Sequence, residues 1–304
     1  MTDTVAAIDC GTNSTRLLIA DRAGRTLDRR MVITRLGQGV DAQRRLSPAG
    51  VERTIETLRS YRKAMDAHGV GAARLVATSA ARDAADRDEF FDAARQVTGV
   101  TPELLAGDEE GRLSFAGATA GLPVGQGPFL VVDIGGGSTE LVVGEATVKA
   151  VWSADVGCVR VSERFLQKDP PAGPELERAR AHVSTVLAAA VEAMGGLAGA
   201  RTLVGLAGTV STAAMVDLGL ERYDRERVHH HRLTAPVVAG ILHELAALPL
   251  EERARRPGVE PGRADVIVGG LVVLDAVLAD LGFAECLVSE SDILDGLVMS
   301  LLDR

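Results

Sequence analysis

One short pattern that occurs twice limits what this chain can fold into. The stretches IDCGTNSTRLLIA, which begins at Ile8, and VDIGGGSTELVVG, which begins at Val132, both fit Asp-x-Gly-x-x-Ser-Thr-x-Leu without a gap. In each copy an apolar run enters a tight polar turn and a second apolar run follows, which is the pattern of a β-hairpin. A single repeat over such a long separation indicates two related domains rather than a solenoid of short period.

The two hairpin tips contain more polar residues than a turn requires, because an Asn-Gly or Asp-Gly pair alone would close a hairpin. Glycine lets backbone amides approach phosphate oxygens, and the hydroxyls add donors. Aspartate supplies a hard oxygen ligand for Mg²⁺. We therefore expect both loops to hold one phosphate chain across a cleft, although two turns with satisfied polar groups are the plainer alternative. The candidate phosphate-binding residues of these loops are Gly11, Thr12, Ser14, Gly135, Gly136, Gly137, Ser138 and Thr139.

The composition is that of a globular protein with room for two cores. The chain has 304 residues, of which 46 % are hydrophobic and 25 % are charged. The most apolar stretch, 264–282, is interrupted by Asp265, Asp275 and Asp280, so we expect no membrane span. The N-terminal residues show no secretion signal, and we expect a cytoplasmic protein.

Net charge and cysteine content narrow the possible partners. A net charge of −9 argues against a nucleic-acid partner, although a polyanionic substrate can still bind in a locally positive cleft. The cysteines Cys10, Cys158 and Cys286 are few and far apart, which suits a reducing compartment and argues against a disulfide framework or a zinc cluster. We expect Cys10, which precedes the first loop, to be a small buried residue.

Apolar periodicity and helix caps predict that each half begins with three strands and then alternates helices with strands. After the opening hairpin, the first half is expected to contain a strand over 26–34, a helix over 47–68, a strand over 74–78, a helix over 87–97, a strand over 102–105 and a helix beginning at 107. The second half is expected to contain strands over 129–133, 139–144, 147–154, 201–205 and 284–288, and helices over 158–167, 174–194, 234–246, 262–281 and 292–302, with a further helix after 205.

This order predicts the α/β class with a mixed sheet in each domain. The loop GLPVGQGP over 121–128 is the best boundary, which gives domains over 1–124 and 125–304. We expect the last helix, about 292–304, to pack back on the first domain.

Charged residues at strand-to-helix turns are candidates for chemistry. Arg82 follows a predicted strand and can pair with phosphate, or can be an ordinary surface arginine. Glu109 and Glu110 begin a helix, where one of them can act as a general base or a metal ligand, but acids are also common there because of the helix dipole. Gly208 and Thr209 open another helix, where they can bind an anion or merely cap the helix.

Two further polar segments are weaker candidates for a functional role than the loops and turns above. The tract RVHHHR over 227–232 has no spaced carboxylate or cysteine beside it, so we expect a solvated loop. A weak phosphate-binding patch formed by neighbouring arginines is the alternative there. The segment over 251–263 is expected to be an exposed loop or cap.

The chain as a whole resembles the exopolyphosphatases and guanosine pentaphosphate phosphohydrolases of the Ppx/GppA family. The motifs that carry the resemblance follow in the family's order: IDCGTNSTRLLIA, ATSAARDA, EEGRLSFAGA, VVDIGGGSTELVVG, DVGCVRVSERF, LAGTVSTAA, RADVIVGGLVVL and VSESDILDGL. The glycine loops taken singly also occur in the wider actin-like ATPase and sugar kinase superfamily. The resemblance implies two ribonuclease-H-like domains that flank a cleft, and Mg²⁺-dependent removal of a terminal phosphate.

The resemblance also implies roles for individual residues. Glu110, the second glutamate of EEGR, resembles the catalytic base, and Arg82 and Asn13 resemble phosphate contacts. Asp133 and Glu140 resemble the acids that support Mg²⁺ and water, and Gly135 lines the phosphate chain. The internal repeat adds Asp9 as a further metal ligand.

Two departures from the family pattern bear on the substrate. The sequence stops at 304 without the C-terminal helical domains of longer members, so we expect a preference for short polyphosphate chains. The segment SESDILDGL lacks the arginine of the usual Gly-Leu-Arg-[ED]-Gly ending.

The expected activity is hydrolysis of the terminal phosphoanhydride of inorganic polyphosphate. The sequence does not decide the oligomeric state, for which a homodimer is one candidate. Guanosine pentaphosphate, a molecule of the stringent response, is the alternative substrate. Two further hypotheses are an ATP-dependent kinase and a non-catalytic sensor of polyphosphate or guanosine tetraphosphate.

Overall fold

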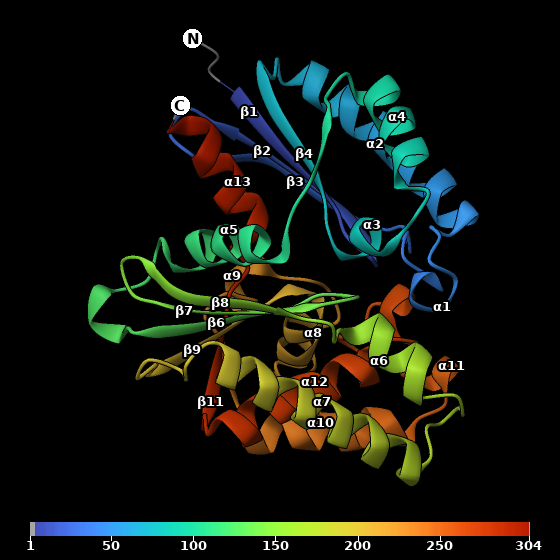
Figure 1. Cartoon of the computed structure of the whole chain (residues 1–304), viewed down its shortest axis with the longest axis vertical. Helices are drawn as coiled ribbons and strands as arrows, with labels where there is room; N and C mark the ends of the chain where they lie inside the picture. The colour runs from blue at the N-terminus through green and yellow to red at the C-terminus, as the bar shows by residue number, and fades with distance from the viewer. Residues whose placement is uncertain (1–3, 304) are drawn as a thin grey trace. The chain divides into compact units, whose positions relative to one another are not determined.

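The computed structural model describes residues 4–303, and their contacts divide them into two compact units (Figure 1). The first unit runs to Gly117 and resumes at Asp292, and the second unit comprises Ala118–Ser291. The first unit is therefore discontinuous in sequence, and its last helix is contributed by the end of the chain. The sequence-based domain boundary at 124/125 stays a prediction.

The first unit is built around a mixed sheet in the order β3-β2-β1-β4-β5. Strand β1 is antiparallel to β2 and parallel to β4, and β4 is parallel to β5. Its strands are β1 (Thr4–Cys10), β2 (Ser14–Asp21), β3 (Thr26–Ile33), β4 (Ala72–Ala77) and β5 (Pro102–Leu104). Its helices are α1 (Val40–Gln43), α2 (Pro48–Ala67), α3 (Ser79–Asp83), α4 (Arg87–Thr98), α5 (Gly107–Thr119) and α13 (Ile293–Leu302).

Alternation along β1 explains how both faces of this sheet are covered. Successive side chains of a strand point to opposite faces. Ala6 and Ile8 belong to the apolar core that includes residues of α2 and α4. Val5 and Ala7 belong to a second core, to which α13 contributes Leu297. The last helix therefore completes the first unit, and it covers the face of the sheet on which Asp9 also lies.

Helices α5 and α13 cross at two glycines. A Cβ atom on Gly117 would lie 2.0 Å from the carbonyl oxygen of Asp292, and one on Gly296 would lie 2.1 Å from the carbonyl oxygen of Leu113. Real Cβ atoms do not approach other atoms so closely, so both positions require glycine. The end of α5 and the start of α13 are thereby held in direct backbone contact.

The second unit repeats this arrangement with a mixed sheet in the order β10-β11-β9-β6-β7-β8. Its strands are β6 (Phe129–Ile134), β7 (Thr139–Gly144), β8 (Val148–Ala154), β9 (Thr202–Leu206), β10 (Arg232–Thr234) and β11 (Glu285–Val288). Its helices are α6 (Cys158–Phe165), α7 (Gly173–Ala193), α8 (Ala207–Asp217), α9 (Arg225–Val228), α10 (Ala235–Ala247), α11 (Leu250–Arg253) and α12 (Ile267–Leu281).

The two hairpins match in register as well as in sequence. Asp9 lies opposite Arg16 in the β1–β2 ladder, and Asp133 lies opposite Glu140 in the β6–β7 ladder. Each first strand is also parallel to the strand that follows the meander, β4 in one unit and β9 in the other. The predicted α/β class with a mixed sheet in each half is therefore confirmed.

The segment over 251–263, expected to be an exposed loop or cap, is exposed only in part, because it begins in α11 and buries Arg253. Arg253 is 3 % exposed and donates hydrogen bonds to the carbonyl oxygens of Leu245, Leu248 and Ala264 at 2.7 to 2.9 Å. A guanidinium can be buried when carbonyl groups satisfy its donors, and here it ties α10 to the turn that precedes α12.

The histidine tract is also more ordered than a solvated loop. His229 Nδ1 accepts a hydrogen bond of 3.0 Å from the Glu290 amide, and His231 Nε2 lies 2.6 Å from a carboxylate oxygen of Asp217. The tract leads directly into β10, which pairs with β11. Of the arginines in the alternative phosphate patch, Arg232 forms an ion pair with Glu285.

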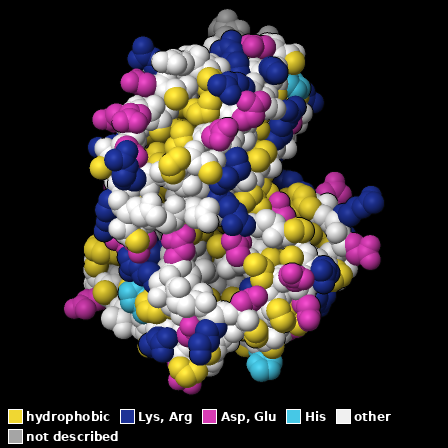
Figure 2. Space-filling view, turned by 90° about the vertical axis from the view of Figure 1, so that its right-hand side faces the viewer, with side chains coloured by type: hydrophobic (Ala, Val, Ile, Leu, Met, Phe, Trp, Pro, Cys, Tyr) yellow, Lys and Arg dark blue, Asp and Glu magenta, His cyan; other side chains and the backbone are white. Residues whose placement is uncertain are grey.

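Figure 2 shows acidic and basic side chains interspersed on the face that it presents, without a continuous basic area there. Among residues 4–303, every helix is too short or too polar to cross a lipid bilayer.

Candidate active site

The carboxyl ends of three parallel strands meet at one edge of the sheet in the first unit. Cys10 lies beside Ala77, and Ala77 lies beside Leu104, in the ladders that join β1, β4 and β5. The segments that follow these strands are loop 1 (residues 11–14), the turn into α3, and the start of α5. Ligands of open α/β sheets bind at such edges. The edge thus brings together the predicted residues of the first half.

Loop 1 is a tight turn whose backbone is hydrogen-bonded to the segment that follows β3. The Gly11 amide donates to the Ser14 carbonyl at 3.0 Å, and the Asn13 carbonyl accepts from the amides of Thr34 and Arg35 at 3.1 and 3.0 Å. Asn13 is 7 % exposed, and its Nδ2 atom lacks a hydrogen-bond acceptor among the described residues. A buried amide donor without a partner is costly, which suits an acceptor supplied by a ligand.

Gly37 joins loop 1 to the turn that carries Arg82. Its amide donates to the Thr12 carbonyl at 2.9 Å. A Cβ atom on Gly37 would lie 2.5 Å from Thr12 Cγ2 and 2.8 Å from Ala80 Cβ. The absence of a side chain at this position therefore allows loop 1 and α3 to pack closely.

Arg82 and Glu110 are brought into direct contact. Arg82 Nη1 lies 2.6 Å from Glu110 Oε2 and also donates to the Leu105 carbonyl at 3.0 Å. The two side chains are 23 % and 12 % exposed, so the pair is accessible but largely enclosed. Glu109 differs from Glu110, because its side chain is 52 % exposed and lies 3.6 Å from Arg74.

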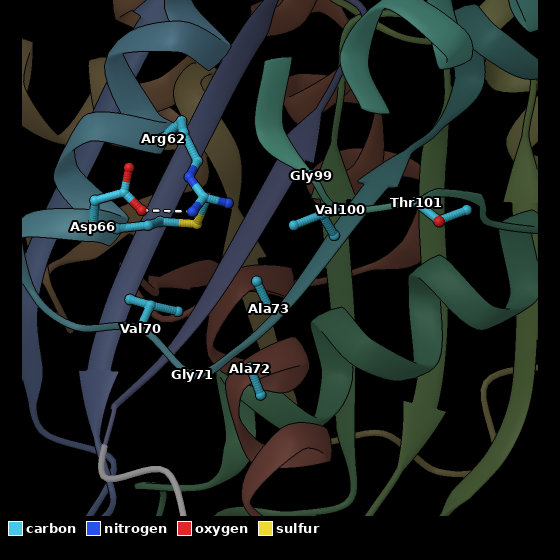
Figure 3. Close-up of a pocket in the computed structure, with 10 residues that line it drawn as sticks. Arg62, Asp66, Val70, Gly71, Ala72, Ala73, Gly99, Val100 and Thr101 are labelled. Atoms are coloured by element: carbon cyan, nitrogen blue, oxygen red, sulfur yellow. Dashed lines mark hydrogen bonds and ion pairs between the residues drawn. The ribbon is translucent and has the colours of Figure 1, made fainter. Parts of the chain in front are cut away.

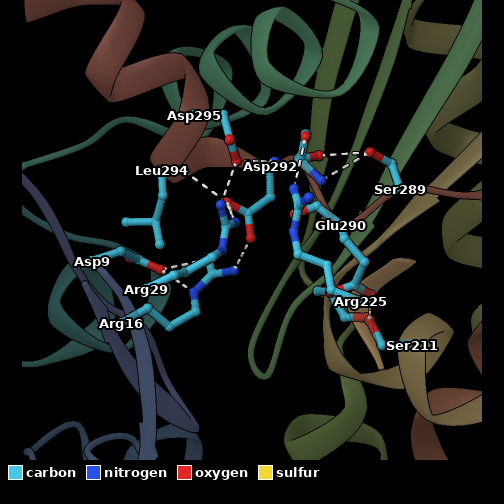
Figure 4. A network of polar contacts seen from close by, with 12 residues as sticks. Asp9, Arg16, Arg29, Ser211, Arg225, Ser289, Glu290, Asp292, Leu294 and Asp295 are labelled. Atoms are coloured by element: carbon cyan, nitrogen blue, oxygen red, sulfur yellow. Dashed lines mark hydrogen bonds and ion pairs between the residues drawn. The ribbon is translucent and has the colours of Figure 1, made fainter. Parts of the chain in front are cut away.

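A largely buried ion-pair network surrounds Asp9, near the end of β1 that leads into loop 1 (Figure 4). Arg16 donates to Asp9 Oδ2 at 2.6 and 3.1 Å and to Asp292 Oδ2 at 2.6 Å. Arg29 Nη2 lies 3.0 Å from Asp292 Oδ1, and Arg29 Nη1 lies 3.0 Å from Asp295. Asp292 also caps α13 by accepting from a backbone amide at 2.9 Å. The network ties the base of loop 1 to the last helix of the same unit.

Burial and neighbouring charges set the protonation of this network. Burial raises the pKa of the Asp9 carboxyl above its usual value, and Arg16 opposes this effect only in part. Burial acts on Asp292 too, but the charges of Arg16 and Arg29 outweigh it and hold the pKa of Asp292 below its usual value. Burial raises the pKa of Asp295. Asp292 is therefore the acid that the two arginines keep ionised.

In the second unit, loop 2 (residues 135–139) is clamped by the start of α6. The carbonyl of Gly135 accepts from the Cys158 amide at 2.9 Å, and Arg160 Nε donates to the Gly137 carbonyl at 2.7 Å. A Cβ atom on Gly157 would lie 2.6 Å from the Gly136 carbonyl oxygen and 2.7 Å from that of Gly135. Loop 2 repeats the internal bond of loop 1, since the Gly135 amide donates to the Ser138 carbonyl at 3.0 Å.

Two carboxylates face each other at the base of loop 2. Asp133 and Glu140 lie opposite each other in the ladder and are 6 % and 1 % exposed. Ser153, the next residue across on β8, donates to Glu140 Oε1 at 2.7 Å. Like charges in directly opposite positions repel each other, so this pair suits a cation. The equivalent pair in the first hairpin, Asp9 with Arg16, is already neutralised.

The two carboxylates at loop 2 fit a divalent ion whose remaining ligands are waters and substrate phosphates. Within residues 4–303, no group of three or more histidine, cysteine, aspartate or glutamate side chains is placed to hold a metal. Mg²⁺ in phosphoryl-transfer sites commonly takes one or two carboxylates, with waters and substrate phosphates as its other ligands. Asp133 and Glu140 are consistent with that arrangement.

The start of α8 lies at the same edge of the second sheet, because β9 runs parallel to β6. The guanidinium of Arg263 packs directly on Gly208, since a Cβ atom there would lie 2.0 Å from Arg263 Nη1. Thr209 is 3 % exposed and lies against Gly270 of α12. The segment after β11 reaches this edge too, and Ser211 Oγ lies 2.5 Å from a carboxylate oxygen of Glu290 (Figure 4).

A separate pocket of about 390 Å³ lies at the opposite end of β4 (Figure 3). Its walls include Val70, Gly71 and Thr101, and the side chain of Arg62 points into the region. Arg62 donates hydrogen bonds to Asp66 Oδ1 at 2.6 Å and to the Thr98 carbonyl at 2.7 Å. This pocket is lined by the amino end of β4, whereas loop 1 and Arg82 follow the carboxyl ends of the strands.

The three cysteines are buried thiols whose environment disfavours the thiolate form. Cys10, Cys158 and Cys286 are buried, and the structure over residues 4–303 forms no disulfide between them. Burial raises the pKa of the Cys158 thiol to about 11 and that of Cys286 to about 12, and it also raises the pKa of Cys10. The thiolate form is therefore scarce near neutral pH. The prediction that Cys10 is a small buried residue is confirmed.

Sequence reasoning missed several residues that hold the site together. Four such residues each contact a predicted site residue or its loop, namely Arg16, Gly157, Ser153 and Arg263. Arg16 could have been found from the sequence, because the hairpin pairing places it opposite Asp9 on an otherwise apolar strand. Ser153 and Arg263 could not, because their partners are set by tertiary packing.

The duplicated fold, the paired Arg82 and Glu110, and the two glycine loops define a class of phosphate-handling enzymes. A family model for the Ppx/GppA phosphatase family matches residues 18–304, and the chain belongs to that family.

Individual relatives match over the whole chain. Exopolyphosphatase 2 of Mycobacterium tuberculosis is 43 % identical over 313 residues, which span 98 % of each chain. A guanosine-5'-triphosphate,3'-diphosphate pyrophosphatase of Aeromonas hydrophila is 31 % identical over 301 residues, which span 98 % of this chain but 59 % of that protein. The crystal structure of an exopolyphosphatase-like protein superposes with a TM-score of 0.93 at 37 % identity and covers 99 % of each chain.

Proposed function

We propose that this chain hydrolyses the terminal phosphoanhydride bond of inorganic polyphosphate. The observation that carries the proposal is the contact of Arg82 with Glu110 at the strand edge that also bears loop 1. It pairs a group that can bind phosphate with a group that can activate water. The 43 % identity to a protein named exopolyphosphatase 2 supports polyphosphate as the substrate.

Glu110 is the proposed general base. Its Oε2 atom is oriented by Arg82, so the carboxylate is held in one direction at the start of α5. A base must lie within hydrogen-bond reach of the water whose proton it removes. Glu109 remains the second candidate, but its greater exposure leaves it less well oriented.

The proposed phosphate contacts are the two loops, the start of α8, and Arg82. In loop 1, Asn13 Nδ2 is a buried donor that a phosphate oxygen would satisfy. Arg82 offsets the charge that shifts onto oxygen during in-line attack by water. Phosphoryl transfer depends mainly on positioning and electrostatics, so these groups account for most of the chemistry. The loop and helix-start contacts in this proposal are Gly11, Thr12, Asn13, Ser14, Gly135, Gly136, Gly137, Ser138, Thr139, Gly208 and Thr209.

Asp133 and Glu140 are the proposed ligands for Mg²⁺, which when bound would neutralise charge on the phosphate oxygens. Ser153 holds one oxygen of Glu140 and so fixes the direction of that carboxylate. The sequence repeat also predicts Asp9 as a ligand, but Arg16 occupies its Oδ2 atom and neutralises it. The structure therefore favours the second hairpin over the first as the metal site.

The test is phosphate release measured side by side from tripolyphosphate, long polyphosphate, guanosine pentaphosphate and ATP, with and without Mg²⁺. We expect Mg²⁺-dependent release from polyphosphate, and comparison of the two polyphosphates checks the predicted preference for short chains. Tight binding of polyphosphate without turnover would instead indicate a sensor. Phosphorylation of an added acceptor by ATP would indicate a kinase.

Guanosine pentaphosphate is the second candidate substrate. The relative from Aeromonas hydrophila, whose name refers to a guanosine nucleotide of this kind, matches 98 % of this chain and supports it. Faster release from guanosine pentaphosphate than from tripolyphosphate would establish this alternative. A homodimer, a cytoplasmic location and the absence of a nucleic-acid partner stay predictions.

A further inference from the structure

The segment over 222–231, to which the proposed hydrolysis assigns no role, lies at the edge of the second sheet where phosphate contacts are expected. Strand β11 is parallel to β9, and directly after β11 the Ser289 amide donates to the Gly205 carbonyl of β9 at 2.9 Å. The His230 amide donates to the Val288 carbonyl at 2.7 Å. The segment is therefore held at the carboxyl end of β11, beside the strand that leads into α8.

Glu290 joins this segment to α8. One of its carboxylate oxygens lies 2.5 Å from Ser211 Oγ (Figure 4). The other accepts a hydrogen bond from the hydroxyl of Tyr223. Ser211 Oγ also donates to the carbonyl of Ala207, the first residue of α8, at 3.2 Å. The hydroxyl of Tyr223 is thereby separated by a single carboxylate from the helix start at which we propose that phosphate binds.

The ring of Tyr223 is open to solvent although its hydroxyl is held in place. The residue is 54 % exposed. The other tyrosine of the chain, Tyr61, is the opposite case, because it is 1 % exposed and its hydroxyl donates to the Thr15 carbonyl in the core of the first unit. An aromatic ring that is fixed at one end and exposed on its face is suited to stacking on a nucleobase.

Further planar side chains of the same segment are attached to the turn after β11. The rings of His229 and His230 are stacked, with centroids 3.7 Å apart and planes at 28°. His229 Nδ1 accepts from the Glu290 amide at 3.0 Å. Arg225 Nη2 lies 3.3 Å from both the Glu290 carbonyl oxygen and Ser291 Oγ. Histidine rings and arginine planes also stack on unpaired bases, so the segment brings several groups of this kind to one place.

We propose that Tyr223 is a specificity-determining residue, whose ring stacks on the base of a nucleoside polyphosphate while the phosphates of that ligand lie at the start of α8 and at loop 2. This inference rests on the proposed hydrolysis of a terminal phosphoanhydride. Every base has a face on which an aromatic ring can stack, so guanine and adenine are held alike. Inorganic polyphosphate has no base and gains nothing from the ring, so Tyr223 favours nucleotides over it.

The experiment compares KM for guanosine pentaphosphate with KM for tripolyphosphate in wild type, Tyr223→Ala, Tyr223→Phe and Leu250→Ala, all with Mg²⁺. In Tyr223→Ala, we expect the ratio of the two KM values to rise about fivefold or more, which is the lower end of the effect of removing one aromatic partner of a base. Tyr223→Phe keeps the ring and should keep most of the wild-type ratio.

Leu250→Ala is the matched control. It shortens another large exposed side chain of the same unit, on α11, and should leave the ratio unchanged. ATP provides a second nucleotide, whose inhibition constant against tripolyphosphate hydrolysis should rise in Tyr223→Ala as well. The same inhibition constant replaces KM for guanosine pentaphosphate if that nucleotide binds without turnover.

The outcomes separate this inference from the proposed function. An unchanged ratio in Tyr223→Ala overturns the role of Tyr223 and leaves the hydrolase proposal standing. An equal rise in Tyr223→Phe also overturns it, because the contact with Glu290 would then matter rather than the ring. Wild type that binds neither nucleotide in equilibrium dialysis overturns it too. A protein that releases no phosphate from any substrate, but whose binding of guanosine pentaphosphate is weakened in Tyr223→Ala, overturns the proposed function and supports the stacking role.

Discussion

The guanidinium of Arg82 and the carboxylate of Glu110 are joined by a hydrogen bond of 2.6 Å, although α3 and α5 reach it from different strands of the sheet. The pair is largely enclosed, and Arg82 is further anchored on the Leu105 carbonyl. A carboxylate held in this way has a fixed orientation, which is what activation of one particular water requires.

Replacement of Glu110 by glutamine is expected to remove most of the hydrolysis while leaving the fold intact. Glutamine keeps a carbonyl oxygen for Arg82 but cannot take a proton from water. A general base typically contributes about 10²- to 10⁴-fold, so kcat for phosphate release should fall by at least about 100-fold. Thermal unfolding of the variant should stay close to that of wild type. Glu109→Gln is the matched control, and a larger loss of kcat in that variant would transfer the role of base to Glu109.

Replacement of Gly157 by alanine is expected to displace loop 2. The new methyl group would meet the carbonyl oxygens of Gly135 and Gly136 at 2.7 and 2.6 Å, so the loop or α6 must move. We expect a loss of about 1–3 kcal/mol in the free energy of unfolding, as for other overpacked sites, and a fall in kcat/KM. The measurement is urea unfolding together with phosphate release.

Gly240→Ala is the control for this prediction. Gly240 lies inside α10, and a Cβ atom there would meet no other atom within 4 Å. Alanine should stabilise that helix by up to about 1 kcal/mol without changing turnover. Normal activity in Gly157→Ala would show that the clamp of loop 2 by α6 is irrelevant to catalysis.

Replacement of Glu140 by glutamine is expected to weaken metal binding. The variant keeps the shape of the side chain and the contact with Ser153 but removes one of two facing carboxylates. We expect the apparent affinity for Mg²⁺ to fall about tenfold or more. The readouts are the rise of Tm on addition of Mg²⁺ and the binding of Mn²⁺ followed by electron paramagnetic resonance. Asp155→Asn, at an exposed acid in the same unit, should change neither readout.

Replacement of Asp292 by asparagine is expected to destabilise the protein in a pH-dependent way. Removing one partner of a buried ion pair typically costs about 3–5 kcal/mol, because the arginines are left without compensation. The pKa of Asp292 is held below its usual value of 3.8, so its contribution is present above that pH and is lost as the pH falls through the lower folded-state value.

The check is urea unfolding of wild type and Asp292→Asn at about pH 7 and at a pH below 3.8. The difference in the free energy of unfolding should be large at neutral pH and should shrink in acid. The raised pKa values of Asp9 and Asp295 act in the opposite sense, because their ionisation in the unfolded chain lowers stability as the pH rises. A difference that is independent of pH would show that Asp292 acts through helix capping alone.

Local signals in the sequence predicted most of the fold. The duplicated hairpins gave the three-stranded start of each half, and the two ladders have the same register because the same pattern fixes both. Helix α2 was predicted accurately because it has clear ends, with a capping Ser47 whose side chain accepts from the Gly50 amide. Periodicity and caps act over a few residues, which is why they can be read without tertiary information.

The site was predictable only where it follows strand ends. Loop 1, Arg82 and Glu110 could be placed together because parallel strands deliver their carboxyl ends to one edge. The network of Arg16, Arg29 and Asp292 could not, because its partners are brought together by the packing of α13 on the sheet. The same applies to Arg253, whose charge suggested an exposed position although three carbonyl groups satisfy it in the interior.

The place of α13 in the first unit has a consequence for synthesis on the ribosome. Val5 and Ala7 are translated almost three hundred residues before Leu297, which is one of the residues that cover them. The second unit is continuous and can complete its sheet before then. One face of β1 therefore stays uncovered by its native partner until α13 has been translated, and apolar surface that is exposed in this way is prone to aggregate.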